Sequence, residues 1–246
     1  MRAVITAGGT VDGAFAVAAG TRIKALAPIG STTPLDAVLD ACEGAGIADA
    51  AVFGGSEVRA HVASRGVRVL DAVADGSVNL LHALDAWPGE RFVFLTSDLP
   101  FATAAGLRDL LARSEPFALT MALADVDAYA ARFPGAPEHS VALGGERVAN
   151  GNAFVIAPEA VPPARAFAAR FFEARKSLPR MALLIGPVTI ARFLARRLRI
   201  ADLEAQARRR LGVRVAALRG CDPGLCFDVD TLEEYDYARA HLGAPR

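Results

Sequence analysis

The sequence predicts a three-layer α/β protein in which helices cover both faces of a mostly parallel β-sheet. Short β-like runs alternate with helical patterns through the first half of the chain. These runs are continuously apolar, as strands are when both of their faces are buried. The chain has 246 residues, of which 53% are hydrophobic, which is enough for one domain with a full core. We therefore expect a single domain over residues 1–246, with a helical, Arg-rich insertion at about 158–211.

The elements of the first half follow from apolar runs bounded by turn residues. Pro34 begins the first expected helix and Gly44 ends it, because proline suits the first helical turn and glycine the position after the last. Strands are expected at residues 3–6, 50–53, 67–70, 91–96 and 117–123. Helices are expected at residues 34–43, 57–64, 79–86 and 103–112.

The second half is less regular. Gly144-Gly145 predicts a hairpin within the irregular stretch 126–161. The stretch 158–211 is long, helical and rich in arginine. The remaining expected elements are strands at 153–156, 213–218 and 225–229 and a helix at 231–241.

Charge and cysteine content narrow the classes of function. The formal net charge is zero, which argues against a nucleic-acid-binding protein. Cys42, Cys221 and Cys226 form no CxxC pair and are odd in number, so a disulfide framework or a zinc site is not expected and a reducing cytoplasm is favoured. The N-terminal apolar run is too short for a signal peptide. Residues 181–194 are interrupted by glycine, proline and arginine, so we expect no membrane span.

Glycines follow the first expected strand, in Ala7-Gly8-Gly9, and Lys24 comes further along. Glycine lets backbone N–H groups approach a phosphate because no Cβ stands in the way. The run is not a dinucleotide-binding fingerprint, because Thr10 occupies the place of the second glycine, and it is not a P-loop. A glycine-rich turn without a ligand is the alternative interpretation.

Asp98 follows the most apolar expected strand, in Thr96-Ser97-Asp98-Leu99-Pro100. Ligands of parallel sheets bind beyond the carboxyl ends of the strands, so an aspartate there is well placed to hold a divalent cation. The alternative is that Asp98 shapes the turn before Pro100 or caps the next helix.

Asp228 and Asp230 are two residues apart, and so lie on one face if the backbone is extended. Magnesium is commonly held by one or two carboxylates together with substrate phosphates. The alternative is local: Asp230 caps the following helix, or Thr231 caps it with Glu234 as its capping-box partner.

Together these motifs resemble the molybdenum-cofactor-guanylyltransferase-like family of NTP transferases, whose fold is the Rossmann-like GT-A fold. The resemblance covers nearly the whole chain and rests on the order and spacing of short motifs. These are Ala7-Gly8-Gly9, the run from Lys24 to Gly30, Ser97-Asp98-Leu99-Pro100, Asn150-Gly151-Asn152-Ala153-Phe154 and Asp228-Val229-Asp230-Thr231.

The resemblance implies a role for each matched position. Lys24 and Asp98 would be catalytic, Lys24 by stabilising charge on the α-phosphoryl group. Asp98 and Asp230 would bind Mg²⁺. The nucleotide would be bound by Ala7, Gly8, Gly9, Lys24, Gly54, Gly76 and Asn79. Gly151 and Asn152 would hold the acceptor.

The expected function is transfer of NMP from an NTP to a small, phosphorylated acceptor with release of pyrophosphate. Such chemistry depends on positioning and on neutralising phosphate charge, which suits a chain without a Ser–His–Asp set. His61, His82, His139 and His241 are interpreted as surface or packing residues.

Two other functions remain open at this point. Asp228-Val229-Asp230 also reads as the DxD motif of a sugar-nucleotide-dependent glycosyltransferase, although that motif normally follows a mid-chain strand, the place that Asp98 holds here. Release of nucleoside diphosphate instead of pyrophosphate would identify that activity. The other alternative is a non-catalytic nucleotide-binding module, against which the joint presence of Lys24, Asp98 and Asp230 argues.

Residues 161–210 hold twelve basic residues and three acidic ones. A solvated helical face is the simplest interpretation; a surface that docks on anionic lipid is another. We predict a lid that closes over the acceptor. Neutralising Arg196 and Arg197 should then raise the acceptor KM with little change in the KM for NTP, and steady-state kinetics with an unchanged acceptor KM would dismiss the lid.

Overall fold

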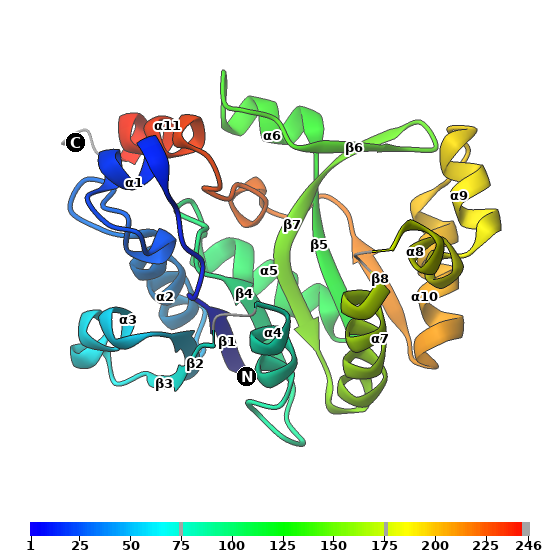
Figure 1. Ribbon diagram of the computed structural model, residues 1–246, viewed down its shortest axis with the longest axis horizontal. Coiled ribbons are helices and arrows are strands. Elements are labelled where there is room, and N and C mark those ends of the chain that lie inside the picture. Colours follow the sequence, from blue (N-terminus) through cyan, green and yellow to red (C-terminus); the bar gives the residue numbers. More distant parts are fainter. Residues whose placement is uncertain (74–75, 175–176, 243–246) are drawn as a thin grey trace.

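The computed structural model describes residues 1–73, 76–174 and 177–242, and within them an eight-stranded sheet lies between two layers of helices (Figure 1). The strands are β1 (Arg2–Thr6), β2 (Asp49–Gly54), β3 (Arg68–Asp71), β4 (Phe92–Thr96), β5 (Leu119–Asp125), β6 (Ser140–Leu143), β7 (Glu146–Ile156) and β8 (Val215–Leu218). The predicted three-layer α/β class is confirmed.

The strand order is β3-β2-β1-β4-β7-β5-β8, and β6 pairs with β7. β1 runs parallel to both β2 and β4, β2 to β3, and β5 to β8. β7 is antiparallel to both of its main neighbours, β4 and β5. The carboxyl ends of β1, β2 and β4 therefore meet at one edge of the sheet.

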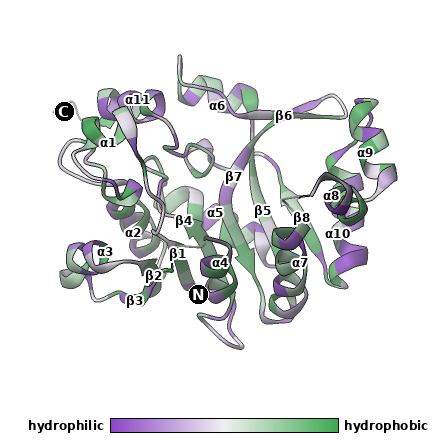
Figure 2. Cartoon of the chain, viewed as in Figure 1, coloured by the Kyte–Doolittle hydropathy of each residue, from purple (hydrophilic) through white to green (hydrophobic). Residues whose placement is uncertain are grey.

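Helices pack on both faces of the sheet. Successive residues of a strand point to opposite faces, so a continuously apolar strand has apolar side chains on each face for helices to cover. Ala3 and Ile5 of β1 enter a core with α2 (Pro34–Gly44) and α5 (Ala104–Ser114), whereas Val4 enters a second core with α4 (Gly76–Leu84). The central strands carry mainly hydrophobic residues, as Figure 2 shows. The helices of the first half are α1 (Gly13–Ala19), η1 (Lys24–Leu26), α2 (Pro34–Gly44), α3 (Ser56–His61), η2 (Ala63–Arg65), α4 (Gly76–Leu84), α5 (Ala104–Ser114) and α6 (Val126–Arg132).

The Arg-rich segment forms consecutive helices between β7 and β8. Figure 1 places α9 (Pro187–Leu194) beyond β8, at the end of the sheet opposite to β3. In the described residues, no helix is both long and apolar enough to span a membrane. The helices of the second half are η3 (Pro158–Ala160), α7 (Val161–Ala174), α8 (Leu178–Ile185), α9 (Pro187–Leu194), α10 (Ile200–Leu211), η4 (Pro223–Leu225) and α11 (Leu232–Leu242).

The strand expected at residues 225–229 is wrong. Leu225 ends the short helix η4, and the residues after it are extended without joining the sheet. Phe227 and Val229 are buried against aromatic side chains that include Phe101, Phe133 and Tyr235. The alternation of apolar and polar residues thus reflects packing on this aromatic cluster. The structure also adds α1 and α6, which the sequence pattern did not predict.

Candidate active site

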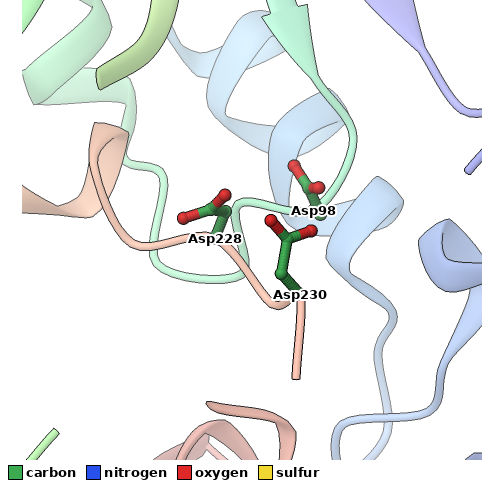
Figure 3. A group of neighbouring side chains, drawn as sticks. All are labelled: Asp98, Asp228 and Asp230. Carbon is green, nitrogen blue, oxygen red and sulfur yellow. The ribbon is translucent and has the colours of Figure 1, made fainter. Parts of the chain in front are cut away.

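Three aspartates meet beyond the carboxyl end of β4. Asp98 lies in the loop between β4 and α5, and Asp228 and Asp230 lie on the extended segment before α11 (Figure 3). One carboxylate oxygen of each lies within 4.8 Å of those of the other two. The backbone N–H of Val229 donates to the carbonyl oxygen of Asp98 at 3.1 Å, which fixes the two segments together. The convergence predicted for Asp98 and Asp230 is present.

The extended backbone explains why Asp228 and Asp230 share a face. Their neighbours Phe227 and Val229 are fully buried in the aromatic cluster, so the alternating carboxylates point away from it. Asp228 is partly buried and Asp230 is exposed. Packing of two apolar side chains therefore presents two acids to Asp98.

The carboxylates of Asp98 and Asp230 are not used to cap the helices that follow them. Thr103 caps α5, because its hydroxyl accepts from the N–H of Gly106 at 3.0 Å. At α11, Thr231 accepts from the N–H of Glu234, and Glu234 accepts in return from the N–H of Thr231. The side chains of Asp98 and Asp230 are thereby left for the cluster.

Lys24 completes the cluster from the glycine loop. Its ammonium group forms ion pairs with both Asp98 and Asp230, and its backbone N–H donates to the carbonyl oxygen of Gly9 at 3.0 Å. An antiparallel bridge between Thr10 and Ile23 holds this loop closed on itself. The loop therefore delivers an ammonium group and a glycine to the same place.

The charged groups of the cluster shift each other's pKa values. Burial, followed by the nearby charges of Asp98 and Asp230, raises the pKa of Asp228 to about 6. Burial alone would raise the pKa of Asp230, but hydrogen bonding and charge from Lys24 lower it below its ordinary value. Burial would likewise lower the pKa of Lys24, and the two carboxylates outweigh it, so that this pKa is raised. Lys24 is consequently a cation at neutral pH.

The remaining nucleotide-binding candidates border the glycine loop. A Cβ on Gly8 would lie 3.2 Å from the Cβ of Ala72 and 3.5 Å from Nδ2 of Asn79, so the backbone of Gly8 passes close to both. The amide of Asn79 exchanges two hydrogen bonds of 2.7 Å with the main chain of Val73. Asn79 thus holds the loop that faces Gly8.

The other nucleotide-binding candidates lie at the carboxyl ends of β1 and β2 and at the start of α4. Ala7 is buried, and its N–H donates to the carbonyl oxygen of Phe53 at 2.7 Å. Gly54 ends β2 beside it, and Gly76 begins α4. Asp75, which directly precedes Gly76, lies outside the described residues.

Gly151 and Asn152 lie on β7, at a shift in its register with β5. The pairing of β7 with β4 ends at Leu95 and Ala153, so Asn152 and Gly151 follow at the carboxyl end of β4, where Asp98 also follows. The acceptor candidates and the carboxylates therefore lie at the same end of β4, its carboxyl end.

Gly151 admits no side chain. A Cβ there would lie 2.3 Å from the carbonyl oxygen of Ala122, and a backbone atom has little room to move. We expect Gly151→Ala to lower the free energy of unfolding by about 2–4 kcal/mol, measured by urea denaturation. Gly55→Ala is the control, because that Cβ meets nothing within 4 Å; equal losses in the two variants would contradict the close approach.

A family model for the MobA-like NTP transferase domain matches residues 3–212. This chain belongs to that family. As a MobA-like NTP transferase it is a nucleotidyltransferase, and its helix-flanked sheet has the GT-A type of architecture. No curated protein matches the chain.

Solved structures share the fold of this MobA-like chain. A hypothetical transferase from Thermus thermophilus has 29% identity and a TM-score of 0.79, over 95% of this chain and 99% of that one. A nucleotidyl transferase from Methanothermobacter thermautotroptrophicus has 16% identity and a TM-score of 0.58, over 98% and 96%. A Mycobacterium tuberculosis H37Rv protein, determined in complex with manganese, has 19% identity and a TM-score of 0.52, over 97% of each chain.

The carboxylates of the MobA-like site fit a divalent cation. Asp98 is 6% exposed, and its Oδ1 is buried without a hydrogen-bond partner among the described residues. A buried, unpaired carboxylate oxygen is costly, and a hard cation with oxygen ligands would satisfy it.

Two residues near the carboxylates, Glu234 and His139, were not predicted as functional. Glu234 is buried and accepts hydrogen bonds from the N–H groups of Asp230 and Thr231, each at 2.7 Å. Its other carboxylate oxygen pairs with His139. Glu234 thereby fixes the end of the segment that carries Asp228 and Asp230.

Glu234→Gln should disturb this anchor without removing a carboxylate of the cluster. The amide carries no charge, so its hydrogen bonds to the two N–H groups and to His139 are weaker than those of the carboxylate, at a cost of about 1–3 kcal/mol. We expect lower thermal stability and about tenfold weaker Mn²⁺ binding, followed by calorimetry. The neighbouring Glu233 is exposed, and Glu233→Gln should change neither; parallel losses in both variants would count against the anchor.

The predicted lid does not cover the carboxylates in this conformation. Arg196 and Arg197 lie between α9 and α10, beside the turn at Gly144. These helices flank β8, whereas Asp98 follows β4, and β7 and β5 lie between the two strands. Three strand spacings are about 14 Å, so these arginines lie beside β8, at a distance from Asp98.

Proposed function

We propose that this protein is a Mg²⁺-dependent nucleotidyltransferase that transfers NMP from an NTP to a small phosphorylated acceptor and releases pyrophosphate. The observation that carries the proposal is the convergence of Asp98, Asp228 and Asp230 beside Lys24 and the glycine loop. A bound divalent cation would need such oxygen ligands, and a triphosphate would need the cation and the ammonium group.

Asp98 and Asp230 are the proposed metal ligands, and Asp228 lies within reach as a third. The magnesium ion, when bound, neutralises charge on the triphosphate. The structure from Mycobacterium tuberculosis in complex with manganese supports a divalent cation in this fold. The unpaired Oδ1 of Asp98 supports it from within this chain.

The proposed step is an in-line displacement at the α-phosphorus. An oxygen of the acceptor phosphate forms the new O–P bond, and the bond between the α-phosphorus and its bridging oxygen breaks. Pyrophosphate leaves with that electron pair. Lys24 stabilises the charge that develops on the α-phosphoryl group, and Gly8 and Gly9 let the backbone approach the phosphates.

The other predicted contacts belong to the same proposal. Ala7, Gly54, Gly76 and Asn79 would border the nucleotide, and Gly151 and Asn152 the acceptor. We also propose that the reaction occurs in the cytoplasm; Cys42, Cys221 and Cys226 are buried free thiols, which supports a reducing compartment.

The proposal is tested by incubating the protein with Mg²⁺, each of the four NTPs and a panel of phosphorylated acceptors. Pyrophosphate release that requires both an acceptor and Mg²⁺, and that stops with a chelator, is the expected result. Release of nucleoside diphosphate from a sugar nucleotide would show a glycosyltransferase instead. Tight NTP binding without turnover of any acceptor would favour a non-catalytic module.

A further inference from the structure

A large apolar cavity lies at the β8 end of the sheet. It has a volume of about 630 Å³ and lies between the strands β5, β7 and β8 and the helices α9 and α10. Leu119, Met121 and Phe154 form its floor, and Ile190, Phe193 and Leu203 belong to its helical wall. Its volume is in the range of small-molecule sites.

We propose that this cavity binds the apolar chain of an amphiphilic acceptor, a phosphate monoester with a single alkyl or isoprenoid chain. The inference rests on the proposed function for the reaction at the phosphate. The cavity then explains the Arg-rich helical insertion, because α9 and α10 supply one of its walls.

The polar groups of the lining leave little for a polar ligand to bind. The hydroxyl of Thr120 bonds to Ser114 at 2.7 Å, and that of Thr189 donates to Gln206 at 2.9 Å. The carboxylate of Glu204 accepts from the backbone N–H of Ala217 at 2.9 Å. A polar acceptor would lose hydrogen bonds to water on entering, whereas an apolar chain gains by leaving water.

Asn150 is the exception. Its side chain is the only polar one of the lining without a hydrogen-bond partner in the described residues. It pairs in register with Leu123 and directly precedes Gly151 and Asn152. The cavity therefore has one polar end, and that end leads toward the loop of Asp98. This arrangement matches a ligand with an apolar chain and a polar head.

The outer surface of α9, which forms part of the cavity wall, suits contact with a lipid layer. A lipid layer is a source of acceptors with such apolar chains. Phe193 lines the cavity and is 53% exposed, and Val188 and Leu194 on the same helix are 65% and 77% exposed. Arg196 and Arg197 follow this helix and have no ion-pair partner among the described residues. Exposed apolar side chains on α9 and cationic side chains directly after it match the surface of an anionic lipid layer.

The test is a chain-length series of alkyl phosphates, from butyl to dodecyl, with the full chain. Binding is measured by calorimetry below the micellar concentration, in the absence of NTP. We expect the Kd to fall about fourfold per added methylene until the cavity is full. A Kd that is independent of chain length would overturn the proposal.

Blocking variants locate the binding. Ala207→Phe fills the cavity from α10, and Ala217→Leu fills it from β8, so one variant serves if the other fails to fold. Each folded variant should weaken dodecyl phosphate binding at least tenfold and leave butyl phosphate binding unchanged. Ala201→Phe is the control, because Ala201 is exposed on α10 and lies outside the lining. Equal affinity in the blocking and control variants would reject the cavity as the site.

Measurements of turnover distinguish a failure of this inference from a failure of the proposed function. Pyrophosphate release with NTP and Mg²⁺ should rise in kcat/KM along the same alkyl series. Turnover that is equal for short and long chains would reject the cavity while supporting the nucleotidyl transfer. Chain-length-dependent binding without pyrophosphate release from any NTP would support the cavity and reject the phosphate as nucleophile.

Discussion

Asp98→Asn should lower the kcat of nucleotidyl transfer by about 10²–10³ and leave the fold intact. The amide has nearly the shape of the carboxylate but carries no charge, so the site loses its most buried anionic oxygen pair. The same change should weaken Mn²⁺ binding, because the remaining acids, Asp228 and Asp230, are the more exposed ones. Pyrophosphate release and calorimetric Mn²⁺ titration measure the two effects.

Asp71→Asn is the matched control for this variant. Asp71 ends β3 at the same edge of the sheet, but it is exposed and paired with Arg59. It should therefore change turnover and Mn²⁺ binding by less than about twofold, as exposed pairs contribute little. A fully active Asp98→Asn variant would remove Asp98 from the proposed mechanism.

Lys24→Met should have opposite effects on turnover and on metal binding. Turnover falls by about 10²–10³ because the charge on the α-phosphoryl group loses its cation. Binding of Mn²⁺ without NTP becomes tighter, because the ammonium group no longer neutralises Asp98 and Asp230. A residue that merely supported the fold would weaken both, so the opposite signs identify the role.

Arg59→Met serves as the control for Lys24→Met, since it removes a cation from an exposed ion pair on the same sheet edge. It should change neither property. If Lys24→Met kept its turnover, or if it bound Mn²⁺ less tightly than the unaltered protein, the assignment of Lys24 would be wrong.

The sequence was informative where local pattern decides the structure. Continuous apolar runs predicted the strands, and the position of Asp98 after a buried strand predicted its place at the sheet edge. The convergence of Asp98 with Asp230 was predicted from motif order and resemblance, since 132 positions separate them in the sequence. The spacing of Asp228 and Asp230 already indicated a shared face, although Asp228 was not included among the metal ligands.

Other features depend on contacts that no local pattern records. The pair of His139 and Glu234 joins residues 95 positions apart. The extended segment at 227–229 resembles a strand because the aromatic cluster imposes the same alternation of burial that a sheet would. The cavity exists because α9 and α10 fold back over the sheet, which the arginine content of these helices does not specify.

The antiparallel strand β7 has a mechanical consequence. Because it pairs with β4 on one side and β5 on the other, a single continuous ladder joins the proposed triphosphate site to the proposed acceptor site. Moving one region relative to the other would break several backbone hydrogen bonds, each worth about 0.5–1.5 kcal/mol. The spacing between the two proposed sites is thus built into a rigid frame, and we expect any adjustment during turnover to occur in the loops and the outer helices.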